Sequence, residues 1–191
     1  MNIRRAQESD APALAKVHVD SWRAAYRGLV LDSVLQGFTY QGRTERFWQS
    51  LATGSEETHL VEENGNVMGF LVLGACRDSD LNVDCTGEIW GIYISPDHWR
   101  KGLGKRLLEE AESMLKSRGY KEAVLWVLER NQQARRFYEA MGFRLDGGIK
   151  DVNLGTPLKA VRYRKTLGPA GQGAEGDATK RAPSLRKAGC L

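Results

Sequence analysis

The sequence predicts an α/β fold in three layers, with a mixed, mostly antiparallel central sheet of six to seven strands and about four flanking helices. Two observations carry this prediction. A strand pattern at residues 88–94, an amphipathic helix at 104–118 and a second strand pattern at 121–128 follow one another, as in a β-α-β unit with parallel strands. Earlier in the chain, Asn64-Gly65 separates two apolar-rich runs, which is a strong signal for an antiparallel hairpin. A sheet built from both units contains parallel and antiparallel strand pairs.

The other elements follow from hydrophobic periodicity and from local start and stop signals. Ser9-Asp10 predicts the beginning of a helix that Gly28 ends. Asn131 is a suitable N-cap for a later helix, and Gly142 stops that helix. The expected elements, in chain order, are a strand at residues 3–6, a helix at 9–26, a helical region at 32–51 that is interrupted near 37–42, strands at 58–63 and 67–76, a polar loop at 77–85, a strand at 88–94, a helix at 104–118, a strand at 121–128, a helix at 131–141, and strands at 143–145 and 160–166.

Size and composition indicate one globular domain, which we place at residues 1–167. The chain has 191 residues, of which 41% are hydrophobic and 27% charged, and this is enough to bury one substantial core. No apolar run approaches the roughly 18 residues that a membrane-spanning helix needs. The first five residues lead into no signal-peptide core. We therefore expect a cytoplasmic protein that does not enter a membrane.

The charge of the chain is concentrated at its end. Residues 168–191 contain four Lys/Arg and two Asp/Glu, so this segment holds about half of the net charge of +4. It has no aromatic or β-branched aliphatic residues, which predicts a disordered basic tail. The folded part is therefore close to neutral, and a nucleic-acid partner is not expected.

Metal and hydrolase sites are not expected either. Cys76, Cys85 and Cys190 form no CxxC pair, and His59 and His98 have no partner at a metal-binding spacing. The GxSxG and HExxH patterns of hydrolases do not occur in the chain.

A glycine-rich basic turn between a strand and a helix is the most informative feature of the sequence. Gly102 and Gly104 let the backbone approach a ligand closely, and the first amides of the following helix are unpaired donors suited to phosphate. The turn is not a P-loop, which would need Gly at position 99 and Ser or Thr at 106. It is not a Rossmann turn either, because Leu107 stands where a third glycine is required.

Three blocks of sequence, read together, are more specific than the turn alone. They are Gly-Glu-Ile-Trp-Gly-Ile-Tyr-Ile-Ser-Pro at 87–96, the turn at 100–105, and Asn-Gln-Gln-Ala-Arg-Arg-Phe-Tyr-Glu-Ala-Met-Gly-Phe at 131–143. In order and spacing they resemble the successive motifs of the GNAT superfamily of acetyl-CoA-dependent N-acetyltransferases. The resemblance covers roughly residues 2–166.

The resemblance implies a splayed sheet that binds acetyl-CoA as cosubstrate. Backbone groups of Ile92, Tyr93 and Ile94 would hold the pantetheine arm in the manner of an added strand. The first position of the family's phosphate motif is Arg or Gln, and Trp99 stands there in this chain. This departure removes one polar side chain but leaves the backbone amides. The residues expected at the pyrophosphate are Arg100, Lys101, Gly102, Leu103, Gly104 and Lys105.

Two residues of the third block match functional positions of the family. Tyr138 matches the tyrosine that protonates the coenzyme A sulfur in many members, although a helix tyrosine that only packs in the core would show the same pattern. Asn131 matches the asparagine that contacts the cofactor, although a helix cap would select Asn without any ligand.

Glu88 is the candidate general base. It lies fourteen residues before Gly102, a spacing that resembles the glutamate of the histone-acetylating branch. Period-two alternation predicts that Glu88 shares a face with Trp90, Ile92 and Ile94. Other relatives carry a glutamate five residues before the asparagine, where this chain has Trp126. The base is therefore expected to be Glu88 or a water relay.

An aromatic stripe on the first helix is the candidate acceptor wall. His18, Trp22 and Tyr26 recur every four residues, a spacing that is also typical of a packed core face. The block Ser-Trp-Arg-Ala-Ala-Tyr-Arg-Gly at 21–28 resembles a bacterial subgroup in which the first two helices wall the acceptor site. We therefore expect Trp22, Tyr26 and Trp90 to bind a small amphipathic or cationic acceptor.

These features predict transfer of an acetyl group to a primary amine of a small molecule or peptide, by direct attack in a ternary complex. The alternative is a non-catalytic module of the same fold that binds acyl-CoA and senses it. A homodimer is compatible with the family, but the sequence identifies no interface.

Overall fold

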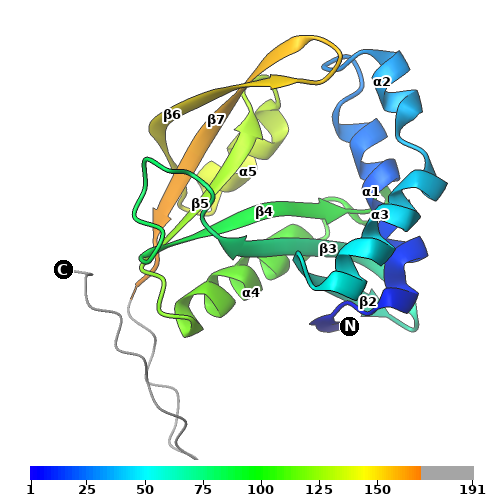
Figure 1. Ribbon diagram of the computed structural model, residues 1–191, viewed down its shortest axis with the longest axis horizontal. Coiled ribbons are helices and arrows are strands. Elements are labelled where there is room, and N and C mark those ends of the chain that lie inside the picture. Colours follow the sequence, from blue (N-terminus) through cyan, green and yellow to red (C-terminus); the bar gives the residue numbers. More distant parts are fainter. Residues whose placement is uncertain (169–191) are drawn as a thin grey trace, which may run out of the picture.

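The structure, a computed structural model, describes residues 1–168 and contains one seven-stranded sheet with helices on both faces (Figure 1). The strands are β1 (Asn2–Arg5), β2 (Glu57–Glu63), β3 (Asn66–Ala75), β4 (Thr86–Ile94), β5 (Glu122–Leu128), β6 (Arg144–Asn153) and β7 (Pro157–Thr166). The helices are α1 (Ala11–Ala25), α2 (Asp32–Gly37), α3 (Tyr40–Thr53), α4 (Leu103–Ser117) and α5 (Gln132–Ala140), with short 3₁₀ helices η1 (Glu8–Asp10) and η2 (Pro96–His98).

The strand order is β1-β2-β3-β4-β5-β7-β6. Every neighbouring pair is antiparallel except β4 and β5, which are the two strands of the predicted β-α-β unit. This confirms the predicted α/β fold with a mixed, mostly antiparallel sheet. The described residues contain five α-helices, because the helical region expected at 32–51 divides into α2 and α3.

The sheet separates two hydrophobic cores. Successive side chains of β3 point to opposite faces, so Phe70 and Val72 pack with α1 and α3, while Leu71 and Leu73 pack with α4. All four are at most 6% exposed. Burial on both faces explains why β3 is an almost continuous apolar run rather than an alternating one.

The sheet opens between β4 and β5. Their parallel pairing covers only Thr86 to Glu88 opposite Glu122 to Val124, after which β4 pairs with β3 alone and β5 with β7 alone. A β-bulge at Trp90 follows at once, since Gly91 pairs with Val72 and Ile89 with Leu73. A bulge bends its strand and increases the local twist. The two strands therefore diverge toward the ends that carry α4 and α5 (Figure 1).

The Asn64-Gly65 hairpin is confirmed, and both residues have positive φ angles, 50° and 78°, as a type I′ turn requires. The end of the sheet differs from the prediction. Strands were expected at 143–145 and 160–166, but β6 and β7 are each ten residues long and form one hairpin. The sequence of β6 is polar and contains Gly147 and Gly148, so its propensity for strand is low. Pairing with β7 along the edge of the sheet overrides that propensity.

The predicted tail at 168–191 lies, except for Gly168, outside the described residues. Within residues 1–168, no helix is both long enough and apolar enough to cross a membrane. Cytoplasmic location stays a prediction.

His18 lies at the centre of an aromatic cluster that holds α1 on the sheet. Its ring centroid is 4.6 Å from that of Tyr93 and 5.7 Å from that of Phe47. The side chain is buried, and its Nδ1 atom has no hydrogen-bond partner among the described residues. Burial, with smaller contributions from Arg43 and Arg46, lowers the pKa of His18 to about 3. The ring is therefore neutral in the folded protein.

This pKa predicts that acid destabilises the protein through His18. The unfolded chain binds a proton near the usual pKa of 6.5, whereas the folded protein does so only near 3. The contribution of His18 to the free energy of unfolding is therefore fully present above pH 6.5. It falls as the pH is lowered from 6.5 toward 3, by up to about 1.4 kcal/mol per pH unit. The free energy of unfolding, measured in urea at several pH values, should fall with acid in the wild-type protein. In a His18→Phe variant, the part of this pH dependence that comes from His18 is expected to disappear. An equal slope in both proteins would contradict the assignment.

Candidate active site

A cleft of about 470 Å³ lies in the opening between β4 and β5. Its walls come from five parts of the chain: the C-terminal half of α1, the bulged half of β4, the turn at 99–105, the end of β5 and the first turns of α5. The divergence of the two strands thus becomes a cavity that side chains leave open.

The first turn of α4 presents free amides to this cleft. Gly102 is the N-cap of α4 and has a φ of 81°, a conformation that glycine adopts without strain. The first helical hydrogen bond runs from the Arg106 amide to the Gly102 carbonyl, at 3.1 Å. The amides of Leu103, Gly104 and Lys105 therefore have no acceptor within residues 1–168. Three free donors at the positive end of a helix dipole fit a phosphate group.

Two features of the turn support this interpretation. A side chain at position 104 would contact the Phe137 ring, because an added Cβ would lie 3.4 Å from its Cζ atom. Arg100 and Lys105 line the cleft and add positive charge, whereas Lys101 does not line it and Leu103 is buried in the core. Leu103 therefore contributes to the predicted site only through its amide.

Trp99, which stands where the family motif has Arg or Gln, stabilises the turn. Its Nε1 atom donates a hydrogen bond to the carbonyl of Ile94 at 2.7 Å. This bond ties the turn to the end of β4. The indole also lines the cleft, so it replaces a polar side chain with an apolar wall.

The residues expected at the pantetheine arm line the cleft. Ile92, Tyr93 and Ile94 lie on the part of β4 that has no strand partner on its β5 side among the described residues. Ile92 and Ile94 pack toward α4, while Tyr93 packs toward His18 on the other face. Their backbone edge is thus open to an extended ligand.

The predicted face of Glu88 is correct for Trp90 and wrong for Ile92 and Ile94. Ile89 packs on the α4 side, so its neighbours Glu88 and Trp90 both lie on the α1 side. The bulge at Trp90 then shifts the alternation by one residue, and Ile92 and Ile94 pack on the α4 side. A period-two argument cannot anticipate an extra residue in the strand.

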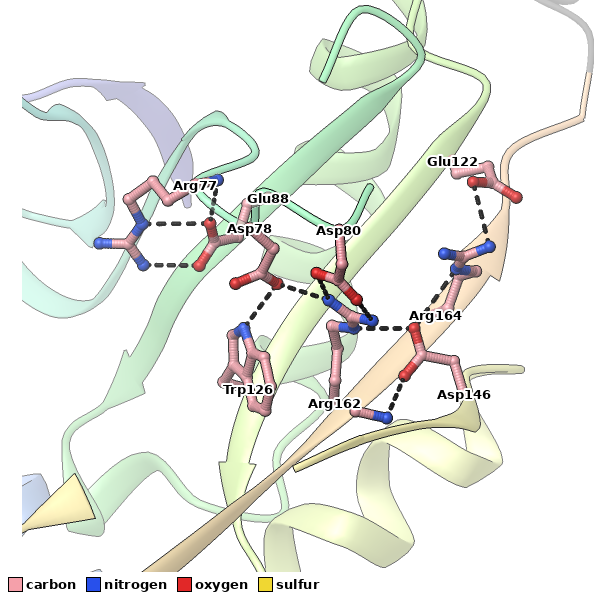
Figure 2. Close-up of polar contacts among 10 residues, drawn as sticks. Arg77, Asp78, Asp80, Glu88, Glu122, Trp126, Asp146, Arg162 and Arg164 are labelled. Atoms are coloured by element: carbon pink, nitrogen blue, oxygen red, sulfur yellow. Dashed lines mark hydrogen bonds and ion pairs between the residues drawn. The ribbon is translucent and has the colours of Figure 1, made fainter. Parts of the chain in front are cut away.

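Glu88 is held by one arginine. The buried carboxylate accepts three hydrogen bonds from Arg77, from the backbone amide at 3.0 Å, from Nε at 3.1 Å and from Nη2 at 2.5 Å (Figure 2). Glu88 is not among the residues that line the cleft. The guanidinium carbon of Arg77 lies 4.3 Å from the ring centroid of Trp90, which does line it.

A second charge network holds Trp126, which the sequence did not identify as a site residue. The indole Nε1 donates to Asp78 at 2.9 Å, and Asp78 also accepts from Arg162 at 3.0 Å (Figure 2). Arg162 is buried and is bound in addition by Asp80 and Asp146. The loop between β3 and β4 is thereby fixed to β5 and β7, and Trp126 is oriented at the wall of the cleft.

Tyr138 enters the cleft from α5 and packs against the Phe137 and Phe143 rings. Burial raises the pKa of the Tyr138 phenol, with further contributions from the neighbouring Tyr26 and Tyr93. Its hydroxyl is therefore protonated at neutral pH. No hydrogen-bond partner for this hydroxyl occurs in the described part of the chain, and Tyr138 lines the cleft, so the hydroxyl is available to a ligand.

Asn131 caps α5 as predicted, since its side chain accepts from the Ala134 amide at 3.1 Å. It is buried and also lines the cleft. Burial raises the pKa of Tyr26, and a hydrogen bond with Asn131 opposes this rise. Asn131 therefore combines the cap with a position at the wall of the cleft.

The aromatic residues predicted for the acceptor are brought together. Trp22, Tyr26 and Trp90 all line the cleft. The Trp22 ring stacks on Phe38 at 4.3 Å and meets Tyr26 edge to face at 4.6 Å. Trp22 and Tyr26 thus form part of a packed helix face, held against Phe38 at the end of α2, as well as part of the cleft wall.

Sequence similarity extends over most of this architecture. Residues 19–143 match the acetyltransferase (GNAT) family. The uncharacterized N-acetyltransferase YuaI of Bacillus subtilis is 30% identical over 172 residues, which are 85% of this chain and 96% of YuaI. The chain belongs to the GNAT family. This GNAT protein is an acetyl-CoA-dependent N-acetyltransferase.

Two relatives of this GNAT enzyme are named for their acceptors. The spermidine N(1)-acetyltransferase of Thermoplasma acidophilum is 26% identical over 153 residues, 76% of this chain and 89% of the relative. The L-amino acid N-acyltransferase MnaT of Escherichia coli is 28% identical over 155 residues, 80% of this chain and 84% of MnaT.

Solved structures share the GNAT fold. The paia N-acetyltransferase of Thermoplasma acidophilum, in complex with coenzyme A, superposes with a TM-score of 0.68 at 22% identity, over 86% of this chain and 98% of that one. The yncA protein of Salmonella typhimurium, with its cofactor acetyl-CoA, gives a TM-score of 0.64 at 23% identity, over 94% and 99%. Membership of the bacterial subgroup suggested by residues 21–28 stays a prediction.

The two glycines that flank α4 provide a test of the phosphate site. Gly102 and Gly119 both have positive φ angles, 81° and 87°, and nothing lies within 4 Å of an added Cβ at either position. Alanine at each site is expected to cost about 1–2 kcal/mol of stability through backbone strain. Only Gly102→Ala disturbs the turn that presents the amides, so its KM for acetyl-CoA should rise about tenfold, equivalent to roughly 1.4 kcal/mol. An equal rise in Gly119→Ala would contradict the assignment.

Proposed function

We propose that this GNAT enzyme acetylates a primary amine of a small molecule or peptide by direct attack, with both substrates bound in the one cleft. The observation that carries the proposal is the continuity of the cavity. It joins the free amides of α4, the hydroxyl of Tyr138 and the aromatic wall of Trp22, Tyr26 and Trp90. The two relatives that are named for spermidine and for L-amino acids support a small amine as acceptor.

Bound acetyl-CoA supplies an activated acetyl thioester. The amides of Leu103, Gly104 and Lys105, with the side chain of Arg100, would hold its pyrophosphate. The open edge of β4 would hold the pantetheine arm. The aromatic wall would exclude water and orient the amine toward the thioester. Coenzyme A would belong to the part of the cleft beside α4, and the acceptor to the part lined by Trp22, Tyr26 and Trp90.

Tyr138 is proposed as the general acid. Its phenol is protonated at neutral pH, because burial raises the pKa, and its hydroxyl is free to donate. It would give its proton to the sulfur that leaves as the amide bond forms. A protonated group is what a departing thiolate requires.

The proton of the attacking amine is proposed to leave through water. No aspartate or glutamate is among the residues that line the cleft, and the Glu88 carboxylate is occupied by Arg77. Of the two routes that the sequence allows, the geometry therefore favours the water relay. Glu88 would act by fixing Arg77 over Trp90.

Tyr138→Phe tests the proposal. With acetyl-CoA and a panel of small amines, release of the coenzyme A thiol is expected from the wild-type enzyme. The variant should lose about 10²- to 10⁴-fold in kcat, the usual contribution of a general acid, with little change in acetyl-CoA binding. Tyr40→Phe is the matched control, because it removes a hydroxyl on exposed α3 that bonds only to Asp20. Unchanged turnover in Tyr138→Phe would contradict the acid role.

Glu88→Gln separates the two proton routes in the same assay. If water carries the proton, the variant loses less than about tenfold in kcat and its kcat/KM profile keeps the acidic limb. A loss of a hundredfold or more, together with disappearance of that limb, would establish Glu88 as the base. Acetyl-CoA binding without transfer to any amine would favour the sensing module instead.

A further inference from the structure

We propose that the acceptor carries an acidic group and that Lys150 binds this group beside Trp126, so that the preferred substrates are amines with a carboxylate rather than polyamines. This inference rests on the proposed function. It deepens that function by naming the class of acceptor and a residue that selects it.

The wall of the cleft is poorly suited to a polyamine. Its charged side chains are Arg100 and Lys105, and it contains no acidic residue. A second or third ammonium group of a polyamine would lose water in this cavity without gaining a carboxylate partner. Aromatic faces can attract a cation, but cations of the protein already occupy positions over two of the rings, Trp90 and Trp126.

Lys150 is not among the residues that line the cleft, but it places a charge beside Trp126, which does line it. In the register of the sheet, Lys150 pairs with Ala160 on β7, and Trp126 pairs with Arg162 two residues further along the same strand. Directly paired residues point to the same face of a sheet, as do residues two apart on one strand. Lys150 and Trp126 therefore lie on one face, and the Lys150 ammonium is 3.9 Å from the Trp126 ring centroid.

The neighbouring carboxylates are already bound by arginines. Glu88 accepts its hydrogen bonds from Arg77, and Asp78 accepts from Arg162. Lys150 forms no ion pair within residues 1–168, although Lys159 of the same hairpin pairs with Asp151 at 3.8 Å. Of the three cations in this group, Arg77 and Arg162 are each bound to carboxylates, and Lys150 is the one that forms no ion pair within residues 1–168.

The environment of Lys150 is consistent with an anionic ligand. The side chain of Lys150 is exposed, and its partial desolvation by neighbouring groups lowers the pKa of the ammonium, an effect that Asp78 and Glu88 oppose. An anion that binds the ammonium would offset this desolvation. Arg77 adds a second cation at the same end of the cleft, since its half-exposed side chain uses Nε and Nη2 for Glu88 and lies over Trp90.

The cleft would then bind an acceptor with an acidic group at two points, its amine and its carboxylate. Its amine would approach the thioester near Tyr138, and its carboxylate would approach Lys150 at the Trp126 end. Apolar parts of the molecule would contact the aromatic wall of the cleft.

Pairs of acceptors that differ only by a carboxylate test this inference. Suitable pairs are leucine with 3-methylbutylamine and phenylalanine with 2-phenylethylamine, and spermidine represents the polyamines. For the wild-type enzyme we expect kcat/KM to be at least about tenfold higher for each amino acid than for its amine, the value of one hydrogen bond to a charged group. Thiol release from acetyl-CoA is the readout.

Variants of the lysine identify the residue responsible. Lys150→Met should lower kcat/KM for the amino acids about tenfold or more, mainly through KM, and leave the amines unchanged. Lys150→Arg keeps the charge and should retain most of the preference. Lys159→Met is the matched control on the same hairpin, because position 159 alternates with Ala160 onto the other face, and it should change neither substrate class.

Several outcomes would overturn the inference while leaving the proposed function intact. One is a wild-type enzyme whose kcat/KM is higher for spermidine or for the amines than for the amino acids. Another is a Lys150→Met variant that changes kcat/KM equally for both members of a pair. A third is a wild-type enzyme that binds acetyl-CoA but acetylates no amino acid in the panel. Failure of the wild-type protein to bind acetyl-CoA would instead overturn the proposed function.

Discussion

The early end of the pairing between β4 and β5 is the constraint on which the rest of the site depends. Three residues of each strand pair, and the bulge at Trp90 then turns β4 away. This break leaves one edge of β4 without a strand, and it aims the first turn of α4 at the gap. Continued pairing would have satisfied the backbone of the sheet and closed the cleft. We therefore propose that the open hydrogen-bonding groups of the sheet bind the extended cosubstrate.

Charge networks hold the opened sheet in place beside Trp90 and Trp126. The loop between β3 and β4 is joined there to β5 and β7, because Asp78 and Asp80 bind Trp126 and Arg162 (Figure 2). Arg162 and Arg77 bind the carboxylates of this loop and of β4, and the same bonds orient Trp126 and Trp90. A buried ion pair adds little net stability, but breaking one is costly, so such a network favours one arrangement over others. The fold and the tryptophan-lined wall of the cleft consequently depend on the same side chains.

The sequence predicted the parts of the molecule whose signals are local. The Asn64-Gly65 turn, the Asn131 cap and the glycines before α4 each determine the conformation at their own position. The bulge at Trp90 and the length of β6 depend on how strands pair rather than on local signals, so alternation placed Ile92 and Ile94 on the wrong face and the sequence analysis missed most of β6. The sequence also did not identify Lys150 as a site residue, because only the register of β6 in the sheet brings it close to Trp126.

The central claim is that the gap between β4 and β5 binds coenzyme A through free backbone amides. Amide NMR of the labelled protein, titrated with coenzyme A, measures this directly. The account predicts large shifts and slower exchange for the amides of Leu103, Gly104 and Lys105 and for residues 91–94, with the amides at the far end of α4 unaffected. Coenzyme A binding that leaves the first turn of α4 unperturbed would contradict it.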